Sequence, residues 1–463
     1  MSEGRFLSGS TMGHVVRMTA TGAFGITFVF LVDAANLVWI AQLGDPQLVA
    51  AIGFAFAIQF FSVSSGVGLM IACTALVSRS IGLRDREGAK VQAGAAMAIA
   101  SAFQAGVAAL VVLFRHDLVA MAGASGETAA LAARYLAFTV PSLVFMSVGL
   151  IASGILRADG FGAKAMYITL ISGAVLMVVD PILILGLGLG LDGAAIGLVL
   201  FRLALMGLGL YFAVFQQRLV IWPGARDALL CMRPYLIIAL PAIATQMATP
   251  VGNYLLTIVM APFGDDAVAA WAVVGRLTVL AFGGIFALSG AIGGIFGQNY
   301  GAGYMDRVRS TYRDALVFCL IYTLAMWAVL FAMTPVVTEL FGLTGQGADV
   351  LYAFTSIGVG GFIFVGALFV SNAAFNNLGK PARSTLLNWA KEAALGWPAA
   401  VVMAGAFGAS GVIYGQAAAS ALVGTLACIW GWFFVHNLQV DTPEPLDLTP
   451  PRPYPNPDRY RRR

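Results

Sequence analysis

Apolar residues in this chain fall into long blocks separated by short polar connections. Blocks of about 20 residues match the roughly 30 Å hydrocarbon core of a bilayer, because a helix rises about 1.5 Å per residue. A transmembrane β-barrel would need strands of alternating polarity, and blocks such as Val107–Phe114 do not alternate. The pattern therefore predicts an all-α membrane protein with 12 transmembrane helices. Their expected ranges are 13–42, 48–77, 91–114, 131–156, 165–190, 193–216, 234–262, 267–297, 312–337, 350–377, 384–408 and 411–436.

The amino-acid composition supports this fold class. Of the 463 residues, 60% are hydrophobic and only 10% are charged, which is too apolar for a soluble protein. The 54 glycines favour a close approach of helix backbones inside a bilayer. The four cysteines show no CxxC spacing and the three histidines do not cluster, so we expect neither disulfides nor a structural zinc site.

Positive charge is distributed unevenly along the chain. Most of the 26 Lys and Arg residues lie at the N-terminus, in the even-numbered connections and in the C-terminal tail. This bias predicts cytoplasmic termini and a multi-pass protein of the bacterial inner membrane. The N-terminus lacks the pattern of a removable signal peptide, so we expect the first span to remain in the membrane. The net charge of +4 reflects this topology, and no nucleic-acid partner is expected.

The two halves of the chain resemble each other at a separation of about 219 residues. Leu43-Gly44-Asp45 matches Phe263-Gly264-Asp265, and Ile81-Gly82 matches Tyr300-Gly301. Six spans separate each pair, so the halves run in the same direction and predict two six-helix lobes related by a pseudo-twofold axis along the membrane normal. The expected parts are a cytoplasmic N-terminus over 1–12, an N-lobe over 13–216, a cytoplasmic linker over 217–233, a C-lobe over 234–436 and a proline-rich, disordered cytoplasmic tail over 437–463.

Several short motifs occur in a fixed order on this map of spans. They are Leu43-Gly44 with Ala50-Ala51, Ser78-Arg79 with Gly82, Leu156-Arg157-Ala158-Asp159-Gly160, Asp180-Pro181-Ile182-Leu183 with Gly193-Ala194-Ala195, and Gly297-Gln298-Asn299-Tyr300-Gly301. In this order the chain resembles the MATE (multidrug and toxic compound extrusion) transporters over residues 13–436. The resemblance implies a V-shaped pair of bundles that exports amphipathic, often cationic compounds in exchange for H⁺ or Na⁺.

Three charged residues lie deep within the spans of the N-lobe. Asp33, Asp180 and Arg202 are each about ten residues, or roughly 15 Å, from the outer end of their span. Two carboxylates and one guanidinium at a common depth predict an ion-exchange site, which would bind H⁺, or Na⁺ at Asp33 and Asp180. The alternative is that Asp180 and Arg202 form a static pair that fixes helix packing.

The span 1 acid departs from the pattern of the resembled family. That pattern places the acid eight residues before Gly44, which is Asn36 here, while Asp33 lies one helical turn lower. Asn36 could supply a carbonyl ligand beside Asp33, or the acid has moved. Positions that carry acids in branches with a second-lobe site fall on Thr249 and Ala367, so the DinF-like branch with its first-lobe acids fits better.

Other polar residues within the spans are candidates for the substrate path. They are Gln59, the stripe Gln246, Thr249 and Asn253, Arg276, and the pair Asn372 and Asn376. The alternative for each amide is an ordinary hydrogen bond between helices. Pro250 lies within the polar stripe and is a candidate hinge, because proline interrupts the helical hydrogen bonds.

The favoured function is therefore a secondary active antiporter for multidrug efflux, which works by alternating access and needs no cofactor besides its coupling ion. A flippase or exporter of a lipid-linked or anionic substrate is the alternative. The sequence has no Walker A motif and no hydrolytic or redox constellation, so we do not expect an enzyme. We expect a monomer whose partners are a small-molecule substrate and the bilayer. The sequence leaves open the substrate, the choice between H⁺ and Na⁺, and the conformational state.

Overall fold

The computed structural model describes residues 4–439, which form helices and no strands. The helices are α1 (Thr11–Ala41), α2 (Pro46–Gly82), α3 (Arg86–Leu113), α4 (Arg115–Met121), α5 (Gly126–Thr139), α6 (Leu143–Ala158), α7 (Gly162–Pro181), α8 (Gly190–Leu210), α9 (Ala225–Met260), α10 (Asp265–Ala291), α11 (Gly293–Gly301), α12 (Met305–Leu340), α13 (Gly345–Ser356), α14 (Gly361–Asn377), α15 (Pro381–Trp389), α16 (Gly396–Phe407) and α17 (Ala409–His436). Short 3-10 or π-helical turns join several of them.

Helix starts follow from local chemistry at the expected turns. Asp45 caps α2 by accepting a hydrogen bond of 2.8 Å from the backbone N–H of Gln47, and Pro46 occupies the first helical position. Asp85 caps α3 in the same way through the N–H of Gly88. Such a cap typically contributes about 1 kcal/mol to helix stability.

Eleven helices of the described region are long and apolar enough to cross a membrane. The remaining predicted span, 384–408, is divided in the structure into α15, a π-helical turn over Ala390–Ala394, and α16. Lys391 and Glu392 occupy that turn and bind each other at 2.5 Å, so the break coincides with the charged pair of this span. With this divided helix, the expected all-α membrane fold is confirmed.

Two other segments differ from the sequence-based ranges, and a third lies mostly outside the described residues. The connection after the third span contains the short helix α4, which the hydropathy pattern did not indicate. The linker expected over 217–233 is helical from Ala225 onward, because α9 begins ahead of its apolar block. Most of the tail expected over 437–463 lies outside the described residues.

The internal repeat is visible in the backbone. Gly44 and Gly264 both have positive φ, at 75° and 95°, and Gly160 and Gly379 have φ of 88° and 87°. Only glycine adopts this conformation without a steric penalty, so each matched turn has the same requirement in both halves. The equivalent fourth and tenth spans are also both interrupted by a 3-10 turn, at Val140–Ser142 and Gly358–Gly360.

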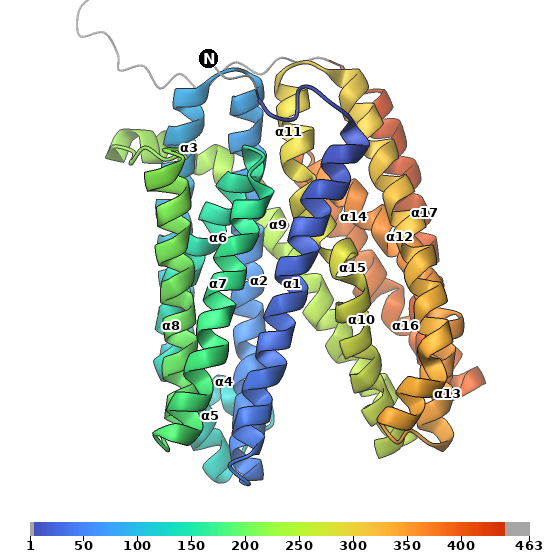
Figure 1. Ribbon diagram of the computed structural model, residues 1–463. Coiled ribbons are helices and arrows are strands. Elements are labelled where there is room, and N and C mark those ends of the chain that lie inside the picture. The colour runs from blue at the N-terminus through green and yellow to red at the C-terminus, as the bar shows by residue number, and fades with distance from the viewer. Residues whose placement is uncertain (1–3, 440–463) are drawn as a thin grey trace, which may run out of the picture.

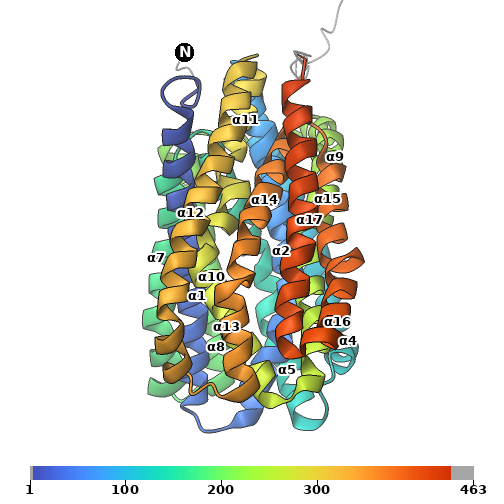
Figure 2. The same cartoon turned by 90° about the vertical axis from the view of Figure 1, so that its right-hand side faces the viewer.

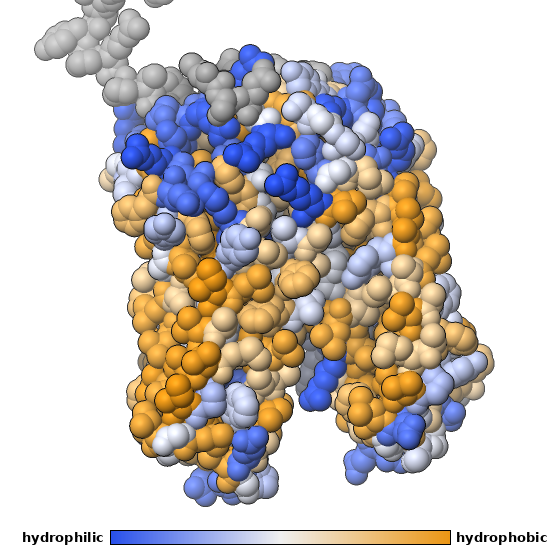
Figure 3. Space-filling view, viewed as in Figure 1, coloured by the Kyte–Doolittle hydropathy of each residue, from blue (hydrophilic) through white to orange (hydrophobic). Residues whose placement is uncertain are grey.

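The helices form two lobes that meet at one end and separate at the other (Figure 1). Both ends of the described chain lie where the lobes meet, as Figure 2 also shows for α17, and we call this the basic end. At the opposite end, which we call the open end, the space-filling view shows a cleft between the lobes (Figure 3). Helices α1 and α9 connect the lobes, because α1 packs on α7 and α10 while α9 packs on α2 and α15.

The lobes join at the basic end through a seam of glycines, which comprises Gly82 of α2 and Gly294 and Gly301 of α11. A Cβ atom at Gly82 would overlap the carbonyl oxygen of Gln298, and one at Gly301 would overlap that of Arg79. A Cβ at Gly294 would lie 2.7 Å from the carbonyl oxygen of Arg157. The glycine seam therefore lets the two backbones touch and closes the basic end.

An N-terminal strap, defined as Gly4–Ser10, crosses this closed end. On the N-lobe side, the Arg5 guanidinium lies 3.9 Å from the centre of the Phe161 ring. On the C-lobe side, the backbone N–H of Phe6 donates to Gln298 Oε1 at 3.0 Å. The same strap thus contacts both lobes where they meet.

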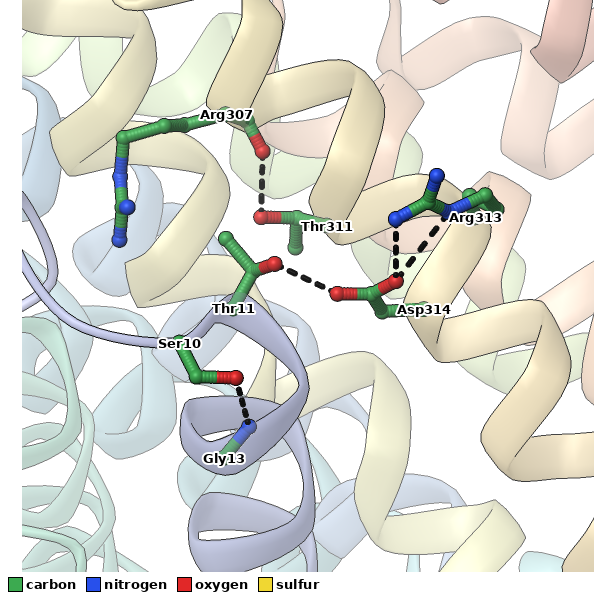
Figure 4. Close-up of polar contacts among 7 residues, drawn as sticks. All are labelled: Ser10, Thr11, Gly13, Arg307, Thr311, Arg313 and Asp314. Atoms are coloured by element: carbon green, nitrogen blue, oxygen red, sulfur yellow. Dashed lines mark hydrogen bonds and ion pairs between the residues drawn. The ribbon is translucent and has the colours of Figure 1, made fainter.

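Helix α12 holds the end of the strap and the start of α1. Arg307 donates from Nη2 to the carbonyl oxygen of Phe6 at 2.8 Å and from Nη1 to that of Gly9 at 2.9 Å. Figure 4 shows Ser10 capping α1 and Thr11 pointing toward Asp314, to which its hydroxyl donates at 2.5 Å. Because these bonds join α1 to α12, they add to the closure of the basic end.

Candidate functional site

Asn36 and Asp180 form the central contact of the N-lobe candidate site. The side-chain amide of Asn36 on α1 donates to Asp180 Oδ2 on α7 at 2.5 Å. The other carboxylate oxygen, Oδ1, is buried and has no hydrogen-bond partner among the described residues. Gly197 of α8 leaves the room for this oxygen, since a Cβ there would overlap it. A buried carboxylate oxygen without a donor is a natural acceptor for a proton or a metal cation.

Asp33 lies on the inward face of α1. It shares the helical face of Val15, Gly22 and Ile40, which are buried, because their spacings are close to whole numbers of turns. The opposite face carries large exposed apolar side chains suited to acyl chains: Phe24, Leu31 and Val38. The Asp33 side chain is exposed. Because it lies on the inward face of α1, it is open to the space inside the protein and not to lipid.

The two carboxylates and the guanidinium occupy one region of the N-lobe. Asp33 is close enough to Asp180 and Arg202 for electrostatic interaction with both. Tyr135 of α5, which is buried, interacts with the same three charges. Asp33 and Tyr135 therefore each lie within electrostatic reach of both Asp180 and Arg202.

Arg202 does not pair with Asp180 in the part of the chain that the structure describes. It donates to the carbonyl oxygen of Thr139 at 2.7 Å, to Ser142 Oγ at 3.0 Å and to Gln59 Oε1 at 2.7 Å. Thr139 ends α5 and Ser142 belongs to the 3-10 turn of the same span. Hydrogen bonds to a charged group are typically worth about 1.5–3 kcal/mol each, so Arg202 fixes the break in span 4 while its charge acts on Asp33.

Gln59 is therefore part of the hydrogen-bond network around Arg202. It is 5% exposed, and its amide nitrogen donates to Thr139 Oγ1 at 2.8 Å. Gln104 is fully buried and donates to the carbonyl oxygen of Ser62 and to Ser65 Oγ. Gln59 thus has the interhelical hydrogen bonds that were the alternative to a role in the substrate path, and Gln104 makes bonds of the same kind.

The uncharged C-lobe candidates are in two separate places. On α9, Gln246 and Thr249 are half-buried and Asn253 is exposed, and none of their side chains bonds to another described residue. On α14, Asn372 and Asn376 are 2% and 1% exposed. Asn372 accepts a hydrogen bond of 3.1 Å from Asn388, so this amide belongs to the interior packing of the lobe.

Helix α9 runs through Pro250 as one continuous helix. Besides the turns in spans 10 and 11, helical geometry in the C-lobe is broken at Phe282 within α10 and at Ile292 between α10 and α11. Proline at 250 still removes the N–H that would bond to the carbonyl oxygen of Gln246. A flexing role for Pro250 stays a prediction.

Three participants in this site were not found from the sequence. Tyr135 is one tyrosine among 13, and its position in the charge cluster depends on how α5 packs. Gly197 was noted as a motif glycine, yet its contact with Asp180 follows only from the packing of α7 on α8. Ser142 bonds to Arg202 from the 3-10 turn that interrupts span 4, which the hydropathy pattern did not indicate.

Comparisons with known proteins agree with this architecture. The MatE family model matches residues 23–182 and 241–402. The chain belongs to this family. It is 24% identical to a Shewanella oneidensis protein named FAD transporter, over 93% of this chain and 96% of that protein. It is also 24% identical to the multidrug export protein MepA of Staphylococcus aureus, over 89% and 91% of the two chains.

The fold agrees with solved MATE structures. A crystal structure of a mutant of the Vibrio cholerae MATE transporter VcmN covers 93% of this chain and 98% of its own, with a TM-score of 0.86 and 24% sequence identity. The protein is thus a multi-pass membrane transporter of the MATE family and not an enzyme. The comparisons do not single out the DinF-like branch.

Proposed function

We propose that this MATE transporter is a secondary antiporter that exports amphipathic, cationic small molecules in exchange for H⁺ or Na⁺. The observation that carries the proposal is the partnerless oxygen of Asp180, held beside Asn36 and near the exposed Asp33. The two carboxylates supply negative charge at a place that water reaches. One bound cation would relieve their mutual repulsion, and its release would restore it.

The cleft at the open end and the seam at the basic end define one of the two states that alternating access requires. We assign the basic end to the cytoplasm of a bacterial cell because Lys and Arg concentrate there. The described conformation is then open to the outside, where Asp33 can take up the coupling ion. One chain contains both lobes, so the monomer is the proposed transport unit.

Arg276 provides a counter-charge on the C-lobe. It is exposed on α10 beside Ala272 and Gly275, where a Cβ atom at Gly275 would meet no atom within 4 Å. A charged side chain within a span requires water or a partner, so this small-residue face of α10 fits the wall of the cleft better than a lipid contact. In the described residues Arg276 has no ion-pair partner.

The position of Arg276 corresponds to that of Asp33 on the other lobe. The antiparallel helices α1 and α10 touch where a Cβ at Gly22 would lie 2.9 Å from the Cβ of Ala287. Asp33 lies 11 residues from Gly22 and Arg276 lies 11 residues from Ala287, both toward the open end. At about 1.5 Å per residue, each is roughly 16 Å from the contact. We propose that closure of the open end brings Arg276 to Asp33 after the coupling ion has left.

This proposal predicts that Arg276→Gln slows transport, because the state closed at the open end loses its ion pair. Efflux is expected to fall about tenfold, within the usual range of coupling free energies of 1–3 kcal/mol. Arg276→Lys keeps the charge and is expected to retain most of the rate. Initial rates of dye efflux from proteoliposomes measure both variants, and a wild-type rate for Arg276→Gln would contradict the proposed pairing.

Arg276 also favours a second candidate function, the export of an anionic amphiphile. An exposed cation in the cleft would attract an anion, and one relative is named an FAD transporter. In that case the partner of Arg276 would be the substrate, and Arg276 would not pair with Asp33. The two candidates differ in which class of compound moves under an imposed ion gradient.

The test uses the purified protein in liposomes under either a pH gradient or a Na⁺ gradient. A cationic dye and a flavin nucleotide are each offered as substrate. Movement of the dye under one of the two gradients is the expected result and also identifies the ion. Movement of the flavin nucleotide alone would favour the second candidate, and no movement of either under both gradients would defeat ion-driven antiport.

A further inference from the structure

A separate cavity of about 780 Å³ opens at the basic end, between the ends of α2, α11, α15 and α17. Among the described residues, its wall combines cationic and aromatic side chains and contains no carboxylate. The lining residues are Arg79, Tyr300, Leu378, Gly379, Lys380, Arg383, Trp430, Phe433, Phe434, Asn437, Leu438 and Gln439. It lies in neither the cleft nor the N-lobe charge cluster.

Both arginines of the cavity stack on aromatic rings. Arg79 lies 5.0 Å from the centre of the Tyr300 ring. Arg383 lies 4.9 Å from the ring centre of Trp430 and 4.8 Å from that of Phe434. A guanidinium over a ring face can still donate hydrogen bonds to an anion. The rings thereby hold two guanidinium groups at the cavity.

The cations of this cavity lack the carboxylate partners that several other cations at the basic end have. Arg86 binds Asp159, Arg309 binds Asp306 and Arg313 binds Asp314. Within the described residues, Arg79, Lys380 and Arg383 form neither an ion pair nor a side-chain hydrogen bond, and Arg79 Nε is buried without any partner. Three positive charges without an acid repel one another, and an anion would remove that cost.

We infer that this cavity binds a phosphate-bearing anion. The planar edge of a guanidinium matches two phosphate oxygens, while the ammonium of Lys380 supplies a third, mobile charge. The phosphate could belong to an anionic phospholipid of the adjoining leaflet or to a dissolved phosphate compound. One face of α17 carries exposed apolar residues up to the cavity: Leu422, Leu426, Ile429 and Phe433. The acyl chains of a bound phospholipid would pack along this face.

A bound phosphate would join the two lobes. Arg79 belongs to α2 of the N-lobe, while Lys380 and Arg383 belong to the C-lobe. The carbonyl oxygen of Arg79 also touches Gly301 of the glycine seam. The three cations are therefore close together only while the basic end is closed, so the anion binds this state preferentially and stabilises it.

Binding to the purified full-length protein tests the inference in two arms. Native mass spectrometry compares adducts of phosphatidylglycerol with those of zwitterionic phosphatidylethanolamine, and calorimetry measures inorganic pyrophosphate. Preferential binding of phosphatidylglycerol identifies a lipid headgroup, and binding of pyrophosphate alone identifies a dissolved ligand. The affinity of whichever probe binds is expected to fall at least tenfold in Arg383→Gln and in Arg79→Gln.

Two further variants make the result decisive. Lys380→Gln alters an exposed loop residue, so it tests the site even where loss of an arginine stack prevents folding. Arg226→Gln removes an exposed cation outside the cavity and is expected to bind like the wild type. Absence of binding in both arms, or equal affinities for the cavity variants and Arg226→Gln, would overturn the inference. Because binding and not transport is measured, neither outcome depends on the proposed antiport.

Discussion

Asp180→Asn is expected to reduce ion-driven efflux to the level of empty liposomes. The substitution keeps the size of the side chain and still offers Asn36 an oxygen to donate to, so the packing of α1 on α7 is retained. It removes the negative charge that would hold H⁺ or Na⁺ at the partnerless Oδ1. Asp33→Asn is expected to have the same effect, because Asp33 is the exposed member of the pair.

Transport is measured as dye efflux under the imposed gradient, and folding as the thermal unfolding temperature of the purified variant. The matched control is Asp192→Asn, an acid at the open end whose bond to Arg134 is largely exposed. Exposed pairs contribute about 0–1 kcal/mol, so this control should fold and transport normally. Wild-type efflux in both Asp33→Asn and Asp180→Asn would show that the coupling ion binds elsewhere.

The sequence predicted the depth of these charges but not their partners. Residue counts from the turn between spans 5 and 6 place Asp180 and Arg202 at one level, and Asp33 interacts electrostatically with both. Counting cannot predict which way each side chain turns. Asp180 points toward Asn36 of α1, whereas Arg202 binds span 4 and Gln59. These directions depend on helix packing, which periodicity does not determine.

Recurring backbone features were easier to predict than contacts without a pattern. Glycines at the ends of matched spans share positive φ values, so sequence similarity located both copies of each turn. The N-terminal strap has no such signal, because Arg307 binds backbone carbonyl oxygens that every residue carries. The break in span 11 was missed since its apolar pattern continues on both sides of Lys391 and Glu392.

A substitution in the glycine seam is expected to have the second large effect, because it destabilises the state that is closed at the basic end. In Gly82→Ala the added Cβ would overlap the Gln298 carbonyl oxygen, and backbone cannot move aside as a flexible side chain can. The population is therefore expected to move toward the state that is open at the basic end and closed at the open end. Transport should fall strongly, since one half of the cycle becomes unfavourable.

A cysteine in the cleft reports this shift. Ala272→Cys lies beside Arg276 on the exposed face of α10, and the four native cysteines are first replaced by alanine. Gly82→Ala is expected to slow maleimide labelling of this cysteine several-fold. The control Gly53→Ala lies on the same helix, where a Cβ would meet no atom within 4 Å, and should label at the wild-type rate. Equal labelling in both variants would mean that contact along the seam does not set the balance between the two states. A selective effect of Gly82→Ala would instead tie closure of the basic end to access at Asp33, which is the link that antiport requires.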